Sequence, residues 1–313
     1  MPTIAKQASP SARARPGIVC WRADRRFAEM ARSMGLDPLD RWVGGYADHE
    51  WDHGRWFLDG AFMGMSGRRV LEFGCNLGAT AVVLAALGAE VEGVDVDEKA
   101  VRLGRLNVAR YGCDGRVRLH HVADTTALPW PDGHFDAVVC NSVLEYVRRP
   151  IRPRLLRELD RLLRPGGALF VIGTSNRLWP REVHTRRLLV NYLPDRLAAA
   201  LGGGGKPIQR GVWPFEILRP LRGYTNLCRA DRGRGYCAAK AGAGAGRAKL
   251  LLLKAADRAV RPLGMTVGLL TPSISVVLQK PPAPGHAGRE SARKRQGRSG
   301  GSGSFAAGEA DGR

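Results

Sequence analysis

Glycines, a carboxylate and an asparagine lie close together in the segment RRVLEFGCNLGAT, residues 68–80. The segment begins with an apolar pattern typical of a buried strand and continues into an apolar run typical of a helix. Gly74 and Gly78 bracket the loop between them, where a missing side chain lets the backbone approach a ligand closely. Glu72 precedes the loop, and Asn76 lies within it as a residue type that tolerates positive φ. A turn of this composition predicts a site for a small polar ligand.

Further polar residues follow the next strand-like segments. Asp95 ends the segment VEGVDVD and is placed to accept hydrogen bonds from two ribose hydroxyls. Asp124 and Thr125 follow the third such segment, where a carboxylate can accept from an adenine amino group. Asn141 follows the fourth and is expected either to face the ligand or to cap the next helix. For the acids and glycines, the structural alternative is an ordinary turn or helix cap.

The elements that must position these residues alternate along the chain. This alternation predicts an α/β fold with a doubly wound, mostly parallel sheet and right-handed crossovers. A last strand, SISVVLQK at 273–280, is expected to pair antiparallel at the sheet edge. We expect strands at 69–73, 90–94, 116–122, 135–140 and 168–173, and helices at about 20–34, 47–63, 77–87, 97–110 and 151–163.

With these motifs in order, the chain resembles the class I S-adenosylmethionine-dependent methyltransferases, particularly the small-molecule, ubiquinone-pathway and type 11-like group. LEFGCNLG resembles the first motif of that family, although Asn76 stands where glycine is most common. GVDVD resembles the ribose-binding strand end of the family. ADTTALPWPDGHFD resembles its adenine segment, and LRPGGALFV resembles its fifth strand. The resemblance covers roughly residues 65–173. It implies a seven-stranded Rossmann-like sheet, S-adenosylmethionine as cofactor, and in-line methyl transfer at the sulfonium.

The α/β alternation fails between about 175 and 265, and we predict an inserted helical substrate cap there. HTRRLLVNYLPDRLAAALGGGG is expected to be helical up to its glycines, and RAKLLLLKAADRAVRPLG to form an amphipathic helix with basic flanks. The expected organisation is a disordered leader (1–16), a methyltransferase domain (17–174 plus 266–280), the cap (175–265) and a disordered basic tail (281–313).

Positive charge is concentrated in the second half of the chain. Residues 40–150 carry a net charge of −4, whereas residues 151–313 carry +20. Such a surface favours acidic partners, so we expect peripheral contact with an anionic membrane. Nucleic acid is not excluded as a partner. The leucines of the basic helix either pack into the cap or lie in a membrane interface. Without a spanning run or an apolar signal core, we expect a cytoplasmic protein, peripheral where it meets a membrane.

The segment GTSNRLWPREVHTRR leaves the fifth strand beside the expected cofactor. His184 within it is the candidate general base, because histidine titrates near neutrality. Glu145 and Tyr146, on an expected helix after the fourth strand, are candidates to line the pocket. The predicted acceptor is a small or lipid-like molecule, methylated at oxygen.

Three sequence features bear on functions other than small-molecule methyl transfer. HEWDH, residues 49–53, fits the zinc peptidase pattern H-E-x-x-H, but Asp52 places a charge between the histidines and no third ligand follows. We therefore predict no metal. An NAD-dependent oxidoreductase would place its third glycine at Ala79 and leave DTTALPW without a role. The basic second half keeps an RNA-directed methyltransferase, or a nucleic-acid-binding module, as the main alternative.

Overall fold

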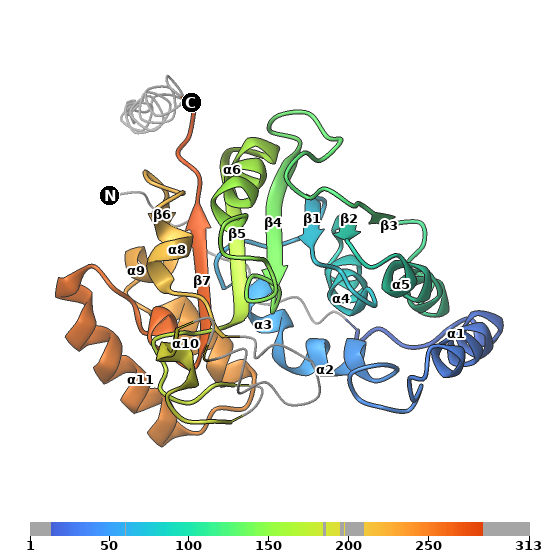
Figure 1. Ribbon diagram of the computed structural model, residues 1–313, viewed down its shortest axis with the longest axis horizontal. Coiled ribbons are helices and arrows are strands. Elements are labelled where there is room, and N and C mark those ends of the chain that lie inside the picture. The colour runs from blue at the N-terminus through green and yellow to red at the C-terminus, as the bar shows by residue number, and fades with distance from the viewer. Residues whose placement is uncertain (1–13, 60, 184–185, 195–196, 198–209, 284–313) are drawn as a thin grey trace, which may run out of the picture.

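The computed structural model describes residues 14–59, 61–183, 186–194, 197 and 210–283. Its centre is a seven-stranded sheet with strand order β3-β2-β1-β4-β5-β7-β6 (Figure 1). The first five strands are parallel to one another, and β7 is antiparallel to both β5 and β6. The predicted doubly wound, mostly parallel sheet is confirmed. The strands are β1 (Arg69–Phe73), β2 (Glu90–Asp95), β3 (Val117–His121), β4 (Phe135–Asn141), β5 (Leu163–Ser175), β6 (Thr225–Asn226) and β7 (Ser273–Gln279).

Helices cover both faces of the sheet, because successive side chains of a strand point to opposite faces. Val70 of β1 packs into the core shared with α4 and α10, whereas the next residue, Leu71, packs into the core shared with α6 and α8. The α-helices are α1 (Trp21–Ser33), α2 (Tyr46–His53), α3 (Arg55–Leu58), α4 (Ala79–Ala86), α5 (Glu98–Arg110), α6 (Arg152–Leu162), α8 (Pro214–Leu218), α9 (Leu227–Ala230), α10 (Arg234–Gly242) and α11 (Arg247–Val260). Short 3₁₀ helices are η1 (Val190–Tyr192), η2 (Arg261–Leu263) and η3 (Val267–Leu269).

The order of the strands places the ligand site. The chain moves from β1 to β2 on one side, whereas β4 pairs with β1 on the other. A crevice forms at such a switch point, outside the carboxyl ends of the strands. Figure 1 shows α2 and α3 lying at this edge of the sheet, and Glu50 of α2 hydrogen-bonds to the last residue of β4.

Several expected elements differ from the structure. The expected helix at 47–63 is divided at Gly54 into α2 and α3, since glycine weakens a helix interior. Residues 142–150 form turns rather than the expected helix, so Glu145 and Tyr146 lie in a loop. The helix expected from residue 184 is absent from 186–194, where η1 is the helical element. β5 also begins five residues earlier than expected.

The segment between 175 and 265 is joined to the sheet as well as to helices. β6 pairs with β7, so β7 is not the edge strand that the sequence analysis expects. α8 packs against α6, and α10 against α3. The domain boundaries stay a prediction.

Of the expected leader, Arg15 forms ion pairs with Asp48 and Asp52 of α2, at 3.0 and 3.2 Å. Residues 1–13 and 284–313 lie outside the described residues.

Candidate cofactor site

The glycine loop between β1 and α4 is held in a left-handed conformation. Gly74, Asn76 and Gly78 have φ angles of +76°, +44° and +70°. A side chain at Gly74 would also overlap Val143, which follows β4. Asn76 adopts the positive φ that the sequence analysis expects of it, so its departure from glycine is compatible with the loop. The backbone is therefore shaped to approach a ligand at the switch point.

Asp95 ends β2 beside this loop. Its Oδ2 accepts a hydrogen bond from the Asn76 amide at 2.8 Å, and its Oδ1 accepts from the Asp97 amide at 3.0 Å. A carboxylate oxygen can accept more than one hydrogen bond, so both atoms retain capacity for ligand hydroxyls. Asp97 has a different task, because its side chain accepts from the Lys99 and Ala100 amides and caps α5. The two neighbouring aspartates are thus separated into a loop-facing and a helix-capping role.

Asp124 and Thr125 lie in the connection between β3 and β4. The Oδ1 atom of exposed Asp124 accepts from the amide and the hydroxyl of Thr126, at 2.8 and 2.7 Å. These hydrogen bonds lower the pKa of Asp124. The structure therefore shows the turn role that the sequence analysis gives as the alternative. The adenine role of both residues stays a prediction.

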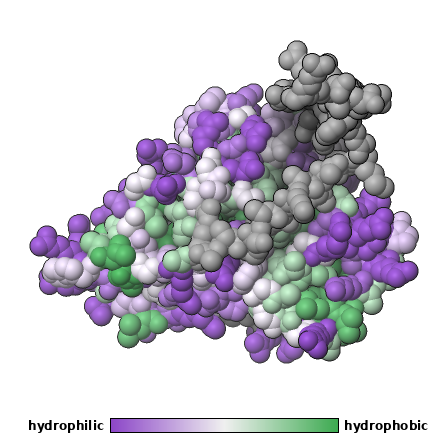
Figure 2. Space-filling model, turned by 180° about the vertical axis from the view of Figure 1, so that it is seen from behind, coloured by the Kyte–Doolittle hydropathy of each residue, from purple (hydrophilic) through white to green (hydrophobic). Residues whose placement is uncertain are grey.

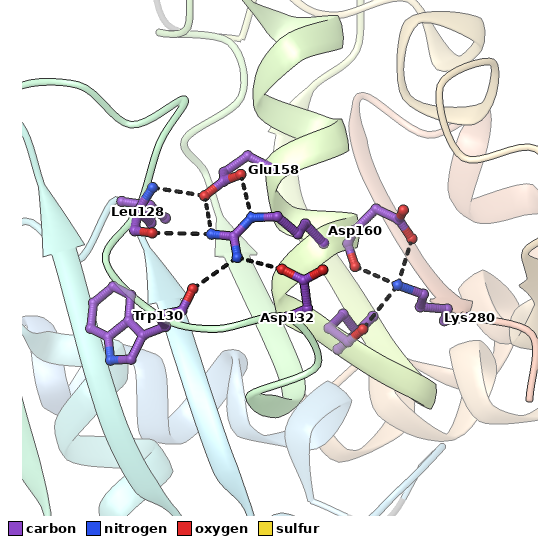
Figure 3. A network of polar contacts seen from close by, with 8 residues as sticks. Leu128, Trp130, Asp132, Glu158, Asp160 and Lys280 are labelled. Atoms are coloured by element: carbon purple, nitrogen blue, oxygen red, sulfur yellow. Dashed lines mark hydrogen bonds and ion pairs between the residues drawn. The ribbon is translucent and has the colours of Figure 1, made fainter. Parts of the chain in front are cut away.

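The same connection is tied to α6 by a network of charged groups (Figure 3). Glu158 accepts from the Leu128 amide at 2.7 Å, and Arg161 donates to the carbonyls of Leu128 and Trp130 at 3.0 and 2.8 Å. Glu158 and Arg161 also pair with each other at 2.7 Å. The Arg161 hydrogen bonds hold the pKa of Glu158 below its usual range. This network positions the chain segment that follows Asp124 and Thr125.

A chain of polar side chains links β1 to α2 across the carboxyl edge. Asn141 donates to Glu50 Oε2 at 2.9 Å and to Thr80 Oγ1 at 3.1 Å. Thr80 in turn hydrogen-bonds to Glu72. Asn141 therefore binds the helix that covers the glycine loop. The described residues 142–150 contain no helix for it to cap, so the capping alternative is wrong.

Glu72 is more deeply buried than Glu50, the other acid linked by Thr80 and Asn141. Burial raises the pKa of its carboxyl well above the usual range, and the nearby acids Glu50 and Asp95 raise it further. Among the described residues, its Oε2 atom has no hydrogen-bond partner. An unpartnered buried carboxylate oxygen is costly, and a ligand cation placed against it would remove that cost. The Oε2 atom of Glu72 could therefore hold a cationic group of a cofactor beside the glycine loop.

Glu50 carries a functional signal that the sequence analysis did not recognise. The residue is 7% exposed, and burial raises the pKa of its carboxyl to about 7. Tyr46, one turn earlier in α2, is electrostatically coupled to Glu50, Glu72 and Tyr146, and burial raises its pKa as well. Asn141, the partner of Glu50, lies 91 positions further along the chain, so no local spacing in the sequence indicates this contact.

The HEWDH segment is used differently from a zinc peptidase motif. Glu50 points to Asn141, whereas the rings of His49 and His53 stack on each other with centroids 4.4 Å apart. His53 Nδ1 also lies 3.0 Å from the His49 carbonyl. Within the described part of the chain, no group of three or more His, Cys, Asp or Glu is arranged to hold a metal. His184, the predicted base, lies outside the described residues.

Comparison with known proteins agrees with this geometry. Residues 70–167 match the family described as "Methyltransferase domain". Similar curated proteins include the ubiquinone biosynthesis O-methyltransferase of Aromatoleum aromaticum, 37% identical over 114 residues (36% of this chain, 47% of that protein). The enzyme of the same name from Xanthomonas oryzae pv. oryzae is 37% identical over 117 residues (37% and 47%). The chain spans about half the length of the curated relatives it matches.

Similar solved structures include an S-adenosylmethionine-dependent methyltransferase from Methanosarcina mazei. It aligns with a TM-score of 0.46 and 16% sequence identity over 71% of this chain and 95% of that one.

In the described residues of our chain, no helix is both long and apolar enough to cross a bilayer. The match over residues 70–167, together with the strand order and the left-handed glycine loop, identifies this part of the chain as a class I S-adenosylmethionine-dependent methyltransferase domain, distantly similar to that of the ubiquinone biosynthesis O-methyltransferases.

Proposed function

We propose that this protein transfers a methyl group from S-adenosylmethionine to an oxygen of a small or lipid-like acceptor. The observation that carries the proposal is the unpartnered, buried Oε2 atom of Glu72 beside the left-handed glycine loop. The methionine part of the cofactor bears an ammonium group, which this carboxylate would bind. The cofactor supplies a methyl group already activated by its sulfonium, so the protein's main task is to align the acceptor.

Other residues of the edge fit the remaining parts of the cofactor. The loop amides approach it most closely, and Asp95 accepts the ribose hydroxyls with the lone pairs that its two backbone hydrogen bonds leave. Asp124 and Thr125 are the proposed adenine contacts, on a segment that the Glu158–Arg161 pair holds against α6. Asn141 fixes α2 over the site.

Glu50 is the residue we propose to accept the proton of the acceptor hydroxyl. It lies at the carboxyl end of β4, excluded from solvent, and is oriented by Asn141. A carboxyl with a pKa of about 7 is suited to general base catalysis at neutral pH, since the most effective base titrates near the working pH. His184 remains the alternative base from the sequence analysis.

The side chains around the opening favour an acceptor with an apolar part. Loops after β4 and β5 expose several large hydrophobic residues beside the site, although such residues are ordinarily scattered over a surface. Tyr192 holds η1 against the first residues after β5, since its hydroxyl donates to the Leu178 carbonyl at 2.6 Å. The exposed large hydrophobic residues of these loops and of α8 include Tyr146, Leu178, Trp179, Val183, Leu188, Leu189, Tyr192 and Phe215.

The basic helix α11 supports contact with an anionic membrane. Leu251 and Leu252 are 66% and 72% exposed, so they do not pack into a core of the cap. Lys249 and Lys254 flank them on the same helix. Figure 2 shows a hydrophobic patch bordered by hydrophilic residues at the lower right, the side of the molecule to which α11 belongs. A helix with exposed leucines between basic residues suits a lipid interface.

Methyl labelling tests the function without knowledge of the acceptor. The purified protein is incubated with S-adenosylmethionine carrying a labelled methyl group and with separate lipid, small-molecule and RNA fractions. We expect base-stable label, as an O-methyl ether gives, in the lipid or small-molecule fraction. Label confined to RNA would establish the alternative acceptor, and label in no fraction would contradict the proposal.

A further inference from the structure

Three arginines gather around one glutamate at the carboxyl ends of β4 and β5. Arg149 follows β4, Arg152 lies in α6, and Glu216 belongs to α8. Arg149 Nε lies 2.5 Å from Glu216 Oε1, and Arg152 Nη1 lies 2.5 Å from Glu216 Oε2. One carboxylate is thus shared by two guanidinium groups.

Arg177 is the third arginine of this group and comes from the loop after β5. It is 9% exposed, its Nε donates to the Asn191 carbonyl at 2.7 Å, and its guanidinium lies over the Trp213 ring at 5.5 Å. Trp213 is joined to Glu216, whose carboxylate accepts from the Trp213 amide at 3.3 Å. Among the described residues, no carboxylate forms an ion pair with Arg177.

Positive charge therefore exceeds negative charge at a site where Arg152 and Arg177 are buried and Arg149 is exposed to solvent. Burial and the neighbouring guanidinium groups lower the pKa of Arg152 and of Arg177. Glu216 and Glu145 supply two negative charges near Arg152, whereas Arg210, which is close enough to be affected by the charges of Arg177 and Arg149, adds a fourth positive charge, so two positive charges are in surplus. Glu145, the other acid near Arg152, also accepts from the Ser175 amide at 3.3 Å. Buried cations are costly unless an anion accompanies them, so the group is prepared for an anionic ligand.

The arginine cluster lies at the same edge of the sheet at which the acceptor is proposed to bind. Arg149 and Arg177 belong to the loops that follow Asn141 and Ser175, the last residues of β4 and β5. The exposed Trp179 and Tyr192 lie on the same loops as Arg177 and its partner Asn191. We propose that Arg149, Arg152 and Arg177 bind the phosphate group of an acceptor whose apolar part contacts these aromatic residues. A surplus of two charges suits a phosphate dianion better than a carboxylate, and this inference rests on the proposed methyl transfer.

Calorimetric titration with decyl phosphate and with inorganic phosphate tests the site. We expect decyl phosphate to bind at least tenfold more tightly than inorganic phosphate, and Arg177→Gln to weaken both at least tenfold. Arg118→Gln is the matched control, because it removes the same charge from a side chain that is 75% exposed. Arg177→Lys keeps the charge but loses the planar guanidinium, which donates several hydrogen bonds and lies over the Trp213 ring, so we expect a partial loss of affinity for both phosphates. Arg149→Gln is the second variant, at a side chain that is 56% exposed, should Arg177→Gln fail to fold.

The outcomes separate this inference from the proposed function. S-adenosylmethionine should bind the wild type, Arg177→Gln and Arg118→Gln with equal affinity. If it binds and decyl phosphate does not, or if Arg177→Gln and Arg118→Gln bind decyl phosphate equally, the phosphate site is wrong while the methyltransferase proposal stands. Equal affinity for inorganic and decyl phosphate would contradict an acceptor site. Failure of S-adenosylmethionine itself to bind would contradict the proposed function.

Discussion

The two sides of the carboxyl edge differ in charge and in how they are assembled. At the ends of β1 and β2, the cofactor side presents carboxylates and backbone amides from residues close in the chain, such as Glu72, Asn76 and Asp95. At the ends of β4 and β5, the acceptor side presents guanidinium groups that are held by contacts between segments far apart in the chain, such as those of Arg149 and Arg152 with Glu216. Binding of a fixed cofactor needs local backbone geometry, whereas recognition of an acceptor is built by tertiary contacts.

Glu50 lies between the two sides, and its removal should have the largest effect on turnover. Glu50→Gln keeps the shape and the Asn141 contact but removes the base, so we expect kcat to fall by about 10²- to 10⁴-fold. Turnover of the wild type should rise with pH through about 7, and the variant should lose this dependence. Asp48→Asn on the same helix is the control. A variant with unchanged kcat and pH profile would assign the base elsewhere.

The same substitution has a consequence for stability that needs no acceptor. Burial raises the pKa of Glu50 to about 7, so between its ordinary value and 7 the folded state binds more protons than the unfolded state. Stability from this group is therefore complete at low pH and falls as pH rises through that window. We expect the difference in Tm between wild type and Glu50→Gln to change across pH 4.5–7.5. A constant difference would contradict the assigned pKa.

A side chain at Gly74 should break the cofactor side alone. Gly74→Ala combines a positive φ with overlap on Val143, and we expect it to weaken S-adenosylmethionine binding by about 3 kcal/mol. Gly67→Ala is the matched control, because Gly67 has a φ of +67° but nothing within 4 Å of an added side chain. Calorimetry should show unchanged affinity for Gly67→Ala. Equal affinities in both variants would remove the loop from the binding site.

Asp95 and Asp97 lie two positions apart but have different roles, so their substitutions should have different effects. Asp95→Ala should weaken cofactor binding by about 1.5–3 kcal/mol, the range for hydrogen bonds to a charged group. Asp97→Ala should instead destabilise the fold by about 1 kcal/mol through loss of the α5 cap, with affinity retained. Calorimetry and thermal unfolding of both variants measure the two effects. Unchanged affinity in Asp95→Ala would show that the ribose assignment is wrong.

The smallest expected effect concerns α11. Replacing Leu251 and Leu252 with serine should reduce sedimentation with phosphatidylglycerol vesicles about tenfold, since each apolar side chain contributes to interfacial binding. Leu39→Ser, at another exposed leucine, is the control. Negligible binding of the wild type to anionic and neutral vesicles alike would exclude the membrane contact.

Local patterns predicted much of the fold and of the cofactor side. The bounds of β1 follow from the apolar residues Val70, Leu71 and Phe73 and from the glycine after them, and the positive φ of Asn76 follows from its residue type. The division of the 47–63 helix at Gly54 was missed, because an isolated glycine does not always end a helix. Neither Glu50 nor the arginine cluster could be found by pattern. Both depend on contacts between residues more than sixty positions apart, such as Glu50 with Asn141 and Arg149 with Glu216.

Titration of the purified wild-type protein with S-adenosylmethionine, and separately with NAD, tests the central claim most directly. We predict one S-adenosylmethionine per chain, bound with an affinity that Gly74→Ala lowers and Gly67→Ala retains, and no heat of binding with NAD. Saturable binding of NAD, with none of S-adenosylmethionine, would contradict the account.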